Sequence, residues 1–277
     1  MKKSIYTTLV LPCFILVTVV LIVPIVMIVI PSFTEGGLSL THYITFLSDP
    51  FYQGILWRTL KLSVITTLIC ALFGIPTAYF ISIQKKSVKS LLQALVMFPL
   101  LTNAVVRGFA WMNVLGRNGL INKFLMSLSL IEEPLSLMYT ELAIVVGSVY
   151  LFLPLMITTL TSVMENIDSD LVNATLSLGA KPYQVFFKVI IPLCFSGILV
   201  GSVLVFTGTL SAYTTPSLLG GNQNMMLATL LYQQANQLSN WTNAGMISLI
   251  MIVLSLTVMK GMNRLSKRLD KRGYEHA

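Results

Sequence analysis

The chain has 277 residues, of which 55% are hydrophobic and only 10% are charged, and its formal net charge is +8. Soluble proteins carry about 25% charged residues, so this composition excludes an ordinary soluble domain and indicates several membrane-spanning helices. The positive charge does not call for a nucleic-acid partner, because lysine and arginine gathered on the inner side of a membrane, near anionic lipid, account for it.

The first apolar run predicts a membrane span at about residues 5–30. It follows Met1-Lys2-Lys3 and could be mistaken for a secretion signal, but the run is too long and no small-residue cleavage site follows it. We therefore expect a retained first span, with residues 1–57 forming an N-terminal helix and the first outer loop.

Five further apolar runs predict spans at about residues 59–83, 91–115, 141–164, 190–212 and 243–262. A span needs about 20 apolar residues to cross roughly 30 Å of hydrocarbon. The sequence therefore predicts an all-α membrane protein with six transmembrane helices. We expect its core to cover residues 58–264 and a basic tail to cover residues 265–277.

The basic residues predict the orientation of these spans. With the N-terminus inside, 13 of the 18 lysines and arginines fall on the inner side: Lys2, Lys3, Lys85, Lys86, Lys89, Lys181, Lys188, Lys260, Arg264, Lys267, Arg268, Lys271 and Arg272. This predicts a multi-pass protein of the bacterial plasma (inner) membrane with both termini in the cytoplasm. The outer loops carry acids that could guide a cation or be merely solvated, namely Glu35, Asp49, Glu132, Glu133 and Glu141.

The third predicted span contains an arginine, Arg107, with Asn103 and Trp111 four residues to either side on the same helix face. A charge inside a membrane is costly unless it faces protein or water, so Arg107 is a candidate for the translocation path. The alternatives are that Arg107 snorkels to the headgroups and that Trp111 is an interfacial anchor. Tyr150 and Tyr213 are further candidates for the path, with ordinary helix packing as their alternative.

A polar segment at residues 168–197 lies between two apolar runs and predicts two short cytosolic helices with a turn between them. Asp168 or Asp170 can cap the first helix. Gly179 supplies the left-handed conformation that ends it, and Pro182 suits the first turn of the second helix. That second helix, Tyr183–Phe187, is aromatic, and an exposed aromatic knob predicts a socket on a partner protein.

The spacing of this segment resembles the EAA loop of permease subunits of ATP-binding-cassette (ABC) importers. The family pattern is Glu-Ala-Ala, three residues, Gly, nine residues, and then Ile-x-Leu-Pro. The corresponding positions here are Asn173, Ala174, Thr175, Gly179, Val189, Ile191 and Pro192. Glycine and proline stand at the family spacing, whereas Asn173 replaces the glutamate and Thr175 replaces the second alanine.

The resemblance implies a type I ABC importer permease fold with a cytoplasmic EAA-type coupling loop that docks on a separate ATPase. The coupling residues would be Asp170, Asn173, Ala174, Gly179, Ala180, Pro182, Tyr183, Phe186, Phe187 and Pro192. The implied partners are a cytosolic ATPase dimer, a second and different permease, and an extracytoplasmic binding protein. The chain lacks a Gly-x-x-x-x-Gly-Lys-Ser/Thr loop, so ATP would be bound by the partner, and no cofactor or metal is expected here.

A second set of residues resembles the permeases of spermidine/putrescine importers: Pro99, Thr102, Asn103, Arg107, Ala110, Trp111, Gly116, Asn118, Gly119 and Asn122. Related permeases for aminoalkylphosphonate, ferric ion, sulfate or thiamine share much of this pattern, so other cargoes stay open. A self-sufficient secondary transporter is the rival from another class. With His42 and His276 as its only histidines and without a nucleophile motif, the chain is not expected to be an enzyme.

Overall fold

The computed structural model describes residues 2–34 and 41–274, which form helices and connecting turns without a strand. Contacts divide the chain into two compact units, one made of residues 1–54 and 230–253 and the other of residues 55–229 and 254–277. The all-α class predicted from the sequence is confirmed. The domain boundaries at 57/58 and 264/265 stay predictions, and Glu35 lies outside the described residues.

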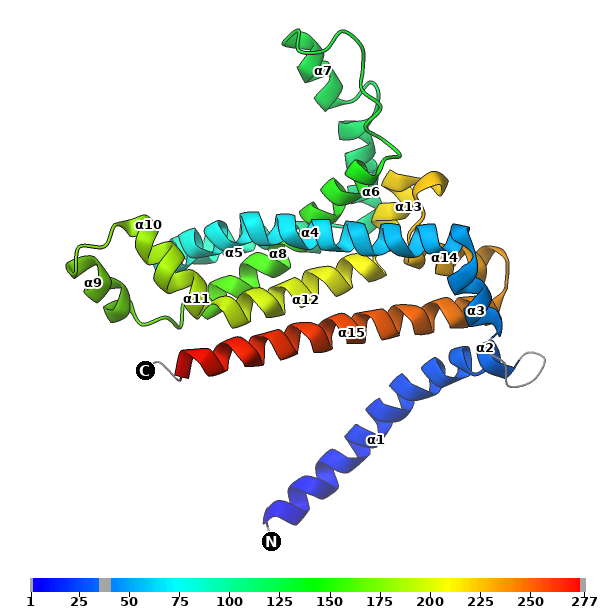
Figure 1. The fold of residues 1–277 in the computed structure, drawn as a ribbon, viewed down its shortest axis with the longest axis horizontal. Helices are drawn as coiled ribbons and strands as arrows, with labels where there is room; N and C mark the ends of the chain where they lie inside the picture. The colour runs from blue at the N-terminus through cyan, green and yellow to red at the C-terminus, as the bar shows by residue number, and fades with distance from the viewer. Residues whose placement is uncertain (1, 35–40, 275–277) are drawn as a thin grey trace. The chain divides into compact units, whose positions relative to one another are not determined.

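The smaller unit contains α1 (Lys2–Val29), α2 (Pro31–Thr34), α3 (Thr41–Ser48), η3 (Gln233–Gln237) and the first part of α15 (Trp241–Tyr274). The described side chains of α1 are mostly exposed, as expected for a helix covered by lipid or by another protein. Figure 1 shows α1 as one long helix that leads into α2. α1 and α15 approach closely at Gly245, where the Ile28 carbonyl occupies the position of a Cβ, so only glycine fits there.

The larger unit holds most of the remaining helices. They are α4 (Pro50–Ser82), α5 (Lys86–Leu101), α6 (Ala104–Leu115), α7 (Leu120–Ser127), α8 (Glu141–Met164), α9 (Ser169–Ser177), α10 (Pro182–Val185), η1 (Phe186–Ile190), α11 (Ile191–Leu193), α12 (Phe195–Ser211), α13 (Thr214–Gly220), η2 (Asn222–Asn224) and α14 (Leu227–Tyr232). The first residues of α4 and the last of α14 are counted with the smaller unit.

Within residues 2–34 and 41–274, four helices are long and apolar enough to span a membrane, or up to six if each of two bent pairs is one span. The four continuous ones are Phe14–Phe33, Pro50–Ser82, Glu141–Met164 and Trp241–Arg264. They correspond to the first, second, fourth and sixth predicted spans. The third and fifth predicted spans are present as apolar segments, and each is a pair of helices joined at a bend.

The third segment bends by 93° between α5 and α6. Thr102 and Asn103 at the break have extended backbones, and the Asn103 side chain accepts hydrogen bonds from the N–H groups of Val105 and Val106. An asparagine with this geometry caps a new helix. The break therefore follows from local capping chemistry, which competes with continuation of the helix.

The fifth segment bends by 68° at Cys194, between α11 and α12. The turn before it, Phe186–Ile190, is a π-helix, and Pro192 follows directly in α11. Proline lacks an N–H donor and clashes with the preceding turn, and π-turns are a frequent cause of such kinks.

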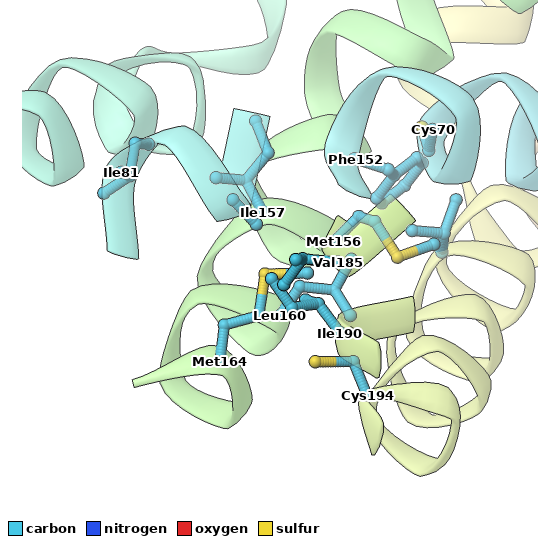
Figure 2. Close-up of a cluster of buried hydrophobic side chains, with 12 residues drawn as sticks. Cys70, Ile81, Phe152, Met156, Ile157, Leu160, Met164, Val185, Ile190 and Cys194 are labelled. Atoms are coloured by element: carbon cyan, nitrogen blue, oxygen red, sulfur yellow. The ribbon is translucent and has the colours of Figure 1, made fainter. Parts of the chain in front are cut away.

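The core of the larger unit is built around α8, which packs against α5, α12 and α13. Met156 and Leu160 of α8 are fully buried in a cluster that includes Cys70, Val185 and Cys194 (Figure 2). Small residues let α12 approach α8 closely, as is common between membrane helices. At Gly197 a Cβ would lie only 2.8 Å from a methyl carbon of Val163.

Replacing Gly197 with leucine should force α12 away from α8, because Val163 is β-branched and cannot rotate out of the way. Overpacking of this kind costs roughly 1–3 kcal/mol. We expect a clearly lower melting temperature for the purified protein in detergent. Gly261→Leu is the matched control, since nothing lies within 4 Å of a Cβ there. Equal melting temperatures for the two variants would contradict the close packing of Gly197 against Val163.

Candidate coupling loop and transport sites

The predicted cytosolic loop has the local structure that its sequence indicates. Asp168 caps α9, and its side chain accepts a hydrogen bond of 2.9 Å from the Asp170 N–H. The chain reverses at Gly179, whose φ of +87° suits only glycine at low cost. Pro182 is the first residue of α10, and the Gln184 side chain accepts a 2.8 Å hydrogen bond from the Lys181 N–H.

Between the two capping candidates, Asp168 is the cap, and Asp170 lies in the first turn of α9. Its charge there is favourable next to the positive end of the helix dipole. The second helix differs from the predicted range 183–187, because α10 ends at Val185 and continues as the π-turn η1. Ala180 belongs to the turn, and Pro192 lies beyond η1 in α11.

The aromatic knob is only partly as predicted. Tyr183 and Phe187 are exposed by 58% and 64%, and Leu178 beside the turn is 89% exposed. Phe186 instead turns inward and packs on Tyr79 of α4, with ring centroids 5.1 Å apart. The loop therefore presents two aromatic rings and a leucine, while Phe186 fastens it to the core.

A cavity of about 380 Å³ lies behind α9 and is lined by Asn173 together with residues of α4, α5 and α8. At its wall the Lys89 Nζ and a Glu165 carboxylate oxygen form an ion pair of 3.2 Å. Glu165 is the C-cap of α8, so this pair joins the end of α8 to the first turn of α5 next to the loop. Sequence reasoning missed it, because two residues 76 apart carry no sign of contact. Ala174 is exposed on α9.

Arg107 has a structural task at the helix break. Its Nη1 donates to the Pro99 carbonyl at 2.9 Å and to the Thr102 carbonyl at 3.4 Å. These carbonyls belong to the end of α5, where no further turn of helix supplies donors. The predicted common face with Asn103 does not exist, because Asn103 is the N-cap of α6 and lies outside the helix.

Three of the five candidates for the translocation path come together. Arg107, Trp111 and Tyr150 line one apolar cavity of about 340 Å³, and the Trp111 and Tyr150 rings meet edge to face at 5.5 Å. Asn103 and Tyr213 do not line it. Tyr213 precedes α13 as its N-cap residue.

The sequence did not predict an ion cluster at the first residue of α8. Glu141, the first residue of α8, pairs with both Arg58 and Lys61 of α4. Arg58 also donates to the Met225 carbonyl at 3.3 Å. Among the outer acids in the described part of the chain, Glu141 is therefore a structural partner of two cations.

Long apolar helices around a central α8, with a capped two-helix loop at one end, form the architecture of a membrane transport subunit. The sequence pattern of the family described as binding-protein-dependent transport system inner membrane component matches residues 71–272. The chain is 32% identical over 241 residues to the spermidine/putrescine transport system permease protein PotB of Haemophilus influenzae, covering 87% of this chain and 84% of that protein. Identity to the protein of the same name from Escherichia coli is 31%, with 87% of each covered.

Solved structures show the same fold. A chain of a bacterial alginate ABC transporter, crystallised with an alginate pentasaccharide-bound periplasmic protein, superimposes with a TM-score of 0.82 over 97% of this chain and 96% of that one, at 16% identity. A chain of the inward-facing MetNI methionine ABC transporter gives 0.59 over 80% and 99%, at 15% identity. The chain belongs to the binding-protein-dependent transport system inner membrane component family, and it is a permease with the type I ABC importer fold.

Replacing Arg107 with leucine should leave two carbonyls at the end of α5 without their charged donor. Such hydrogen bonds are worth roughly 1.5–3 kcal/mol. We expect a lower melting temperature for Arg107→Leu and partial recovery in Arg107→Lys, which keeps one donor group. Arg117→Leu, at an exposed outer position, is the control and should melt like the wild type. An unchanged melting temperature for Arg107→Leu would contradict the role of Arg107 as a cap for the carbonyls at the end of α5.

Proposed function

We propose that this chain is one of two permease subunits of an ATP-driven importer for polyamines such as spermidine and putrescine. The observation that carries the proposal is the identity of 31–32% with two spermidine/putrescine permeases along 87% of this chain. The proposed partners are a cytosolic ATPase dimer, a second and different permease, and an extracytoplasmic binding protein. The alginate transporter solved with a periplasmic protein supports an assembly of this kind.

ATP would be bound and hydrolysed by the partner ATPase, and this chain would hold no cofactor. Its own work would be a conformational equilibrium between inward-open and outward-open states, biased by its partners. The inner lysines and arginines support an orientation with both termini in the cytoplasm, which places the α9–α10 loop on the side of the ATPase.

The α9–α10 loop would be the coupling element. Leu178, Tyr183 and Phe187 offer an apolar surface that a groove on the ATPase can bury. Asn173 carries no charge where the family pattern has glutamate, so docking would rest on this apolar surface. Phe186 on Tyr79 and the Lys89–Glu165 pair would pass a displacement of the loop to α4, α5 and α8.

The cavity lined by Arg107, Trp111 and Tyr150 contains groups with opposite effects on a cationic cargo. Arg107 keeps its positive charge while it donates to the carbonyls of Pro99 and Thr102, so it would repel a polyamine that came close. Trp111 and Tyr150 in the same cavity offer aromatic faces of the kind that attract ammonium groups.

Reconstitution tests the cargo. The tagged chain is co-purified with the proteins that accompany it and placed in liposomes with its binding protein. We expect spermidine or putrescine to stimulate ATP hydrolysis and to accumulate inside, whereas sulfate and thiamine do neither. If sulfate or thiamine stimulates ATP hydrolysis instead, that solute is the cargo and the polyamine proposal is wrong. If the chain purifies alone and transports without ATP, it is a secondary transporter.

Gly179 tests the coupling loop. A β-branched residue with φ near +87° is strained by about 1–2 kcal/mol, although nothing lies within 4 Å of a Cβ there. Gly179→Val should therefore abolish cargo-stimulated ATP hydrolysis while insertion into the membrane stays normal. Gly179→Asn should keep more of it than Gly179→Val, because asparagine enters the left-handed region more readily than valine. Full transport by Gly179→Val would count against a coupling role.

A further inference from the structure

One interhelical contact runs through the larger unit from the outer ion cluster to the core, and we call it the α4–α8 seam. Near its outer end Leu62 of α4 shares a buried cluster with Ile144 of α8. Deeper in, Cys70 lies beside Phe152 in the main core (Figure 2). The Met156 Cγ lies 2.6 Å from the Cβ position at Gly74.

These contacts fix the register of the two helices. From Leu62 to Gly74 the chain advances by the same number of residues as from Ile144 to Met156, so α4 and α8 run side by side in the same direction. Thr66 follows Leu62 by one turn, and Ser148 follows Ile144 by one turn. The two hydroxyl side chains therefore lie at the same depth along the seam, with Ser63 one turn further out.

Ser63, Thr66 and Ser148 share an unusual property. Each side chain is completely buried, and each hydroxyl lacks a hydrogen-bond partner among the residues that the structure describes. Burying a hydroxyl without a partner is unfavourable.

Neighbouring hydroxyls behave differently. Thr59 and Thr67 of α4, like Thr161 of α8, donate to the carbonyl four residues earlier. Serine and threonine in membrane helices can therefore bond to their own helix, and Ser63, Thr66 and Ser148, within about one turn of each other along the seam, do not. A partner supplied in another state of the protein would satisfy them.

The outer end of the seam is charged. The single carboxylate of Glu141 is shared by Arg58 and Lys61, and the three side chains are 26–40% exposed, so water and solutes reach the cluster. Two cations on one carboxylate leave a net positive charge, so an arriving ammonium group binds Glu141 only if it displaces one of them. Lys61 is the more exposed of the two, at 40%, and its ammonium group can return to water when it is displaced.

We propose that the α4–α8 seam recognises a linear cation with at least two ammonium groups. One ammonium group replaces Lys61 on Glu141, and a second donates hydrogen bonds to the hydroxyl oxygens of Thr66 and Ser148 when the seam opens. The seven residues from Glu141 to Ser148 advance along the helix by about 10 Å, which sets the spacing that fits best. This inference rests on the proposed polyamine function and assigns its recognition groups.

The first test compares threonine-to-valine variants, which remove a hydroxyl and keep the shape. Thr66→Val should lower spermidine uptake in liposomes by about tenfold, the value of one hydrogen bond to a charged donor. Its melting temperature should be equal or higher, because an unpartnered hydroxyl is lost. Thr209→Val is the control, since Thr209 is equally buried but donates to the Val205 carbonyl. A lower melting temperature with unchanged uptake for Thr66→Val would overturn the proposal.

A second variant checks the carboxylate. Glu141→Gln should raise the KM for spermidine with a smaller change in kcat, and it should reduce the advantage of spermidine over butylamine, a monoamine that cannot reach both sites. If Glu141 has only a structural role, Glu141→Gln should affect the transport of spermidine and butylamine equally. That result would contradict the assignment.

A third measurement does not depend on the cargo. In a variant with Cys13, Cys70 and Cys194 replaced by alanine, Ser148→Cys should react with a small water-soluble thiol reagent only when the complex is trapped with nucleotide and vanadate. Thr209→Cys should stay unreactive in both states. If liposomes with the wild-type complex do not take up polyamines but Ser148→Cys becomes reactive, the proposed cargo is wrong while the opening of the seam is supported. If Ser148→Cys reacts in neither state, the α4–α8 seam does not open, and the recognition site proposed there is contradicted for any cargo.

Discussion

A backbone polar group in hydrocarbon has no water to bond, and the arrangement of this permease depends on that constraint. Both bent segments need a substitute for the missing helical hydrogen bonds. Asn103 caps the start of α6, and Arg107 reaches back to the carbonyls at the end of α5. Side chains that look like transport machinery in the sequence are therefore first of all a means of bending a helix inside the membrane.

α8 connects the two ends of the larger unit. Its first residue, Glu141, is paired with α4, and its C-cap residue, Glu165, is paired with α5 beside the α9–α10 loop. Between these ends it packs α5, α12 and α13 around a core of Met156 and Leu160. A displacement of the loop at one end thus has one continuous helix through which to act on the charged cluster at the other.

The sequence was sufficient for the features that local chemistry determines. Charge-free runs of span length gave the helical segments, and the Asp168–Gly179–Pro182 pattern gave the two-helix loop with its left-handed turn. Sequence reasoning was insufficient where one side chain can form either of two favourable sets of hydrogen bonds. Asn103 reads equally well as a helix-face residue and as a cap, and the choice depends on the Arg107 bonds across the break. The ion pairs of Glu141 and Glu165 join distant segments, which no local pattern can reveal.

The separation of the two carboxylates at the ends of α8 also indicates the bilayer thickness that suits this helix. The helix has 24 residues, and at about 1.5 Å per residue it places Glu141 and Glu165 about 36 Å apart. The hydrocarbon layer is roughly 30 Å thick, so each carboxylate stands just beyond one of its boundaries when the helix is only slightly tilted. A thicker membrane would draw an ion pair into lipid, and a thinner one would tilt α8. Lipid chain length is thus a physical variable to which α8 is expected to be sensitive.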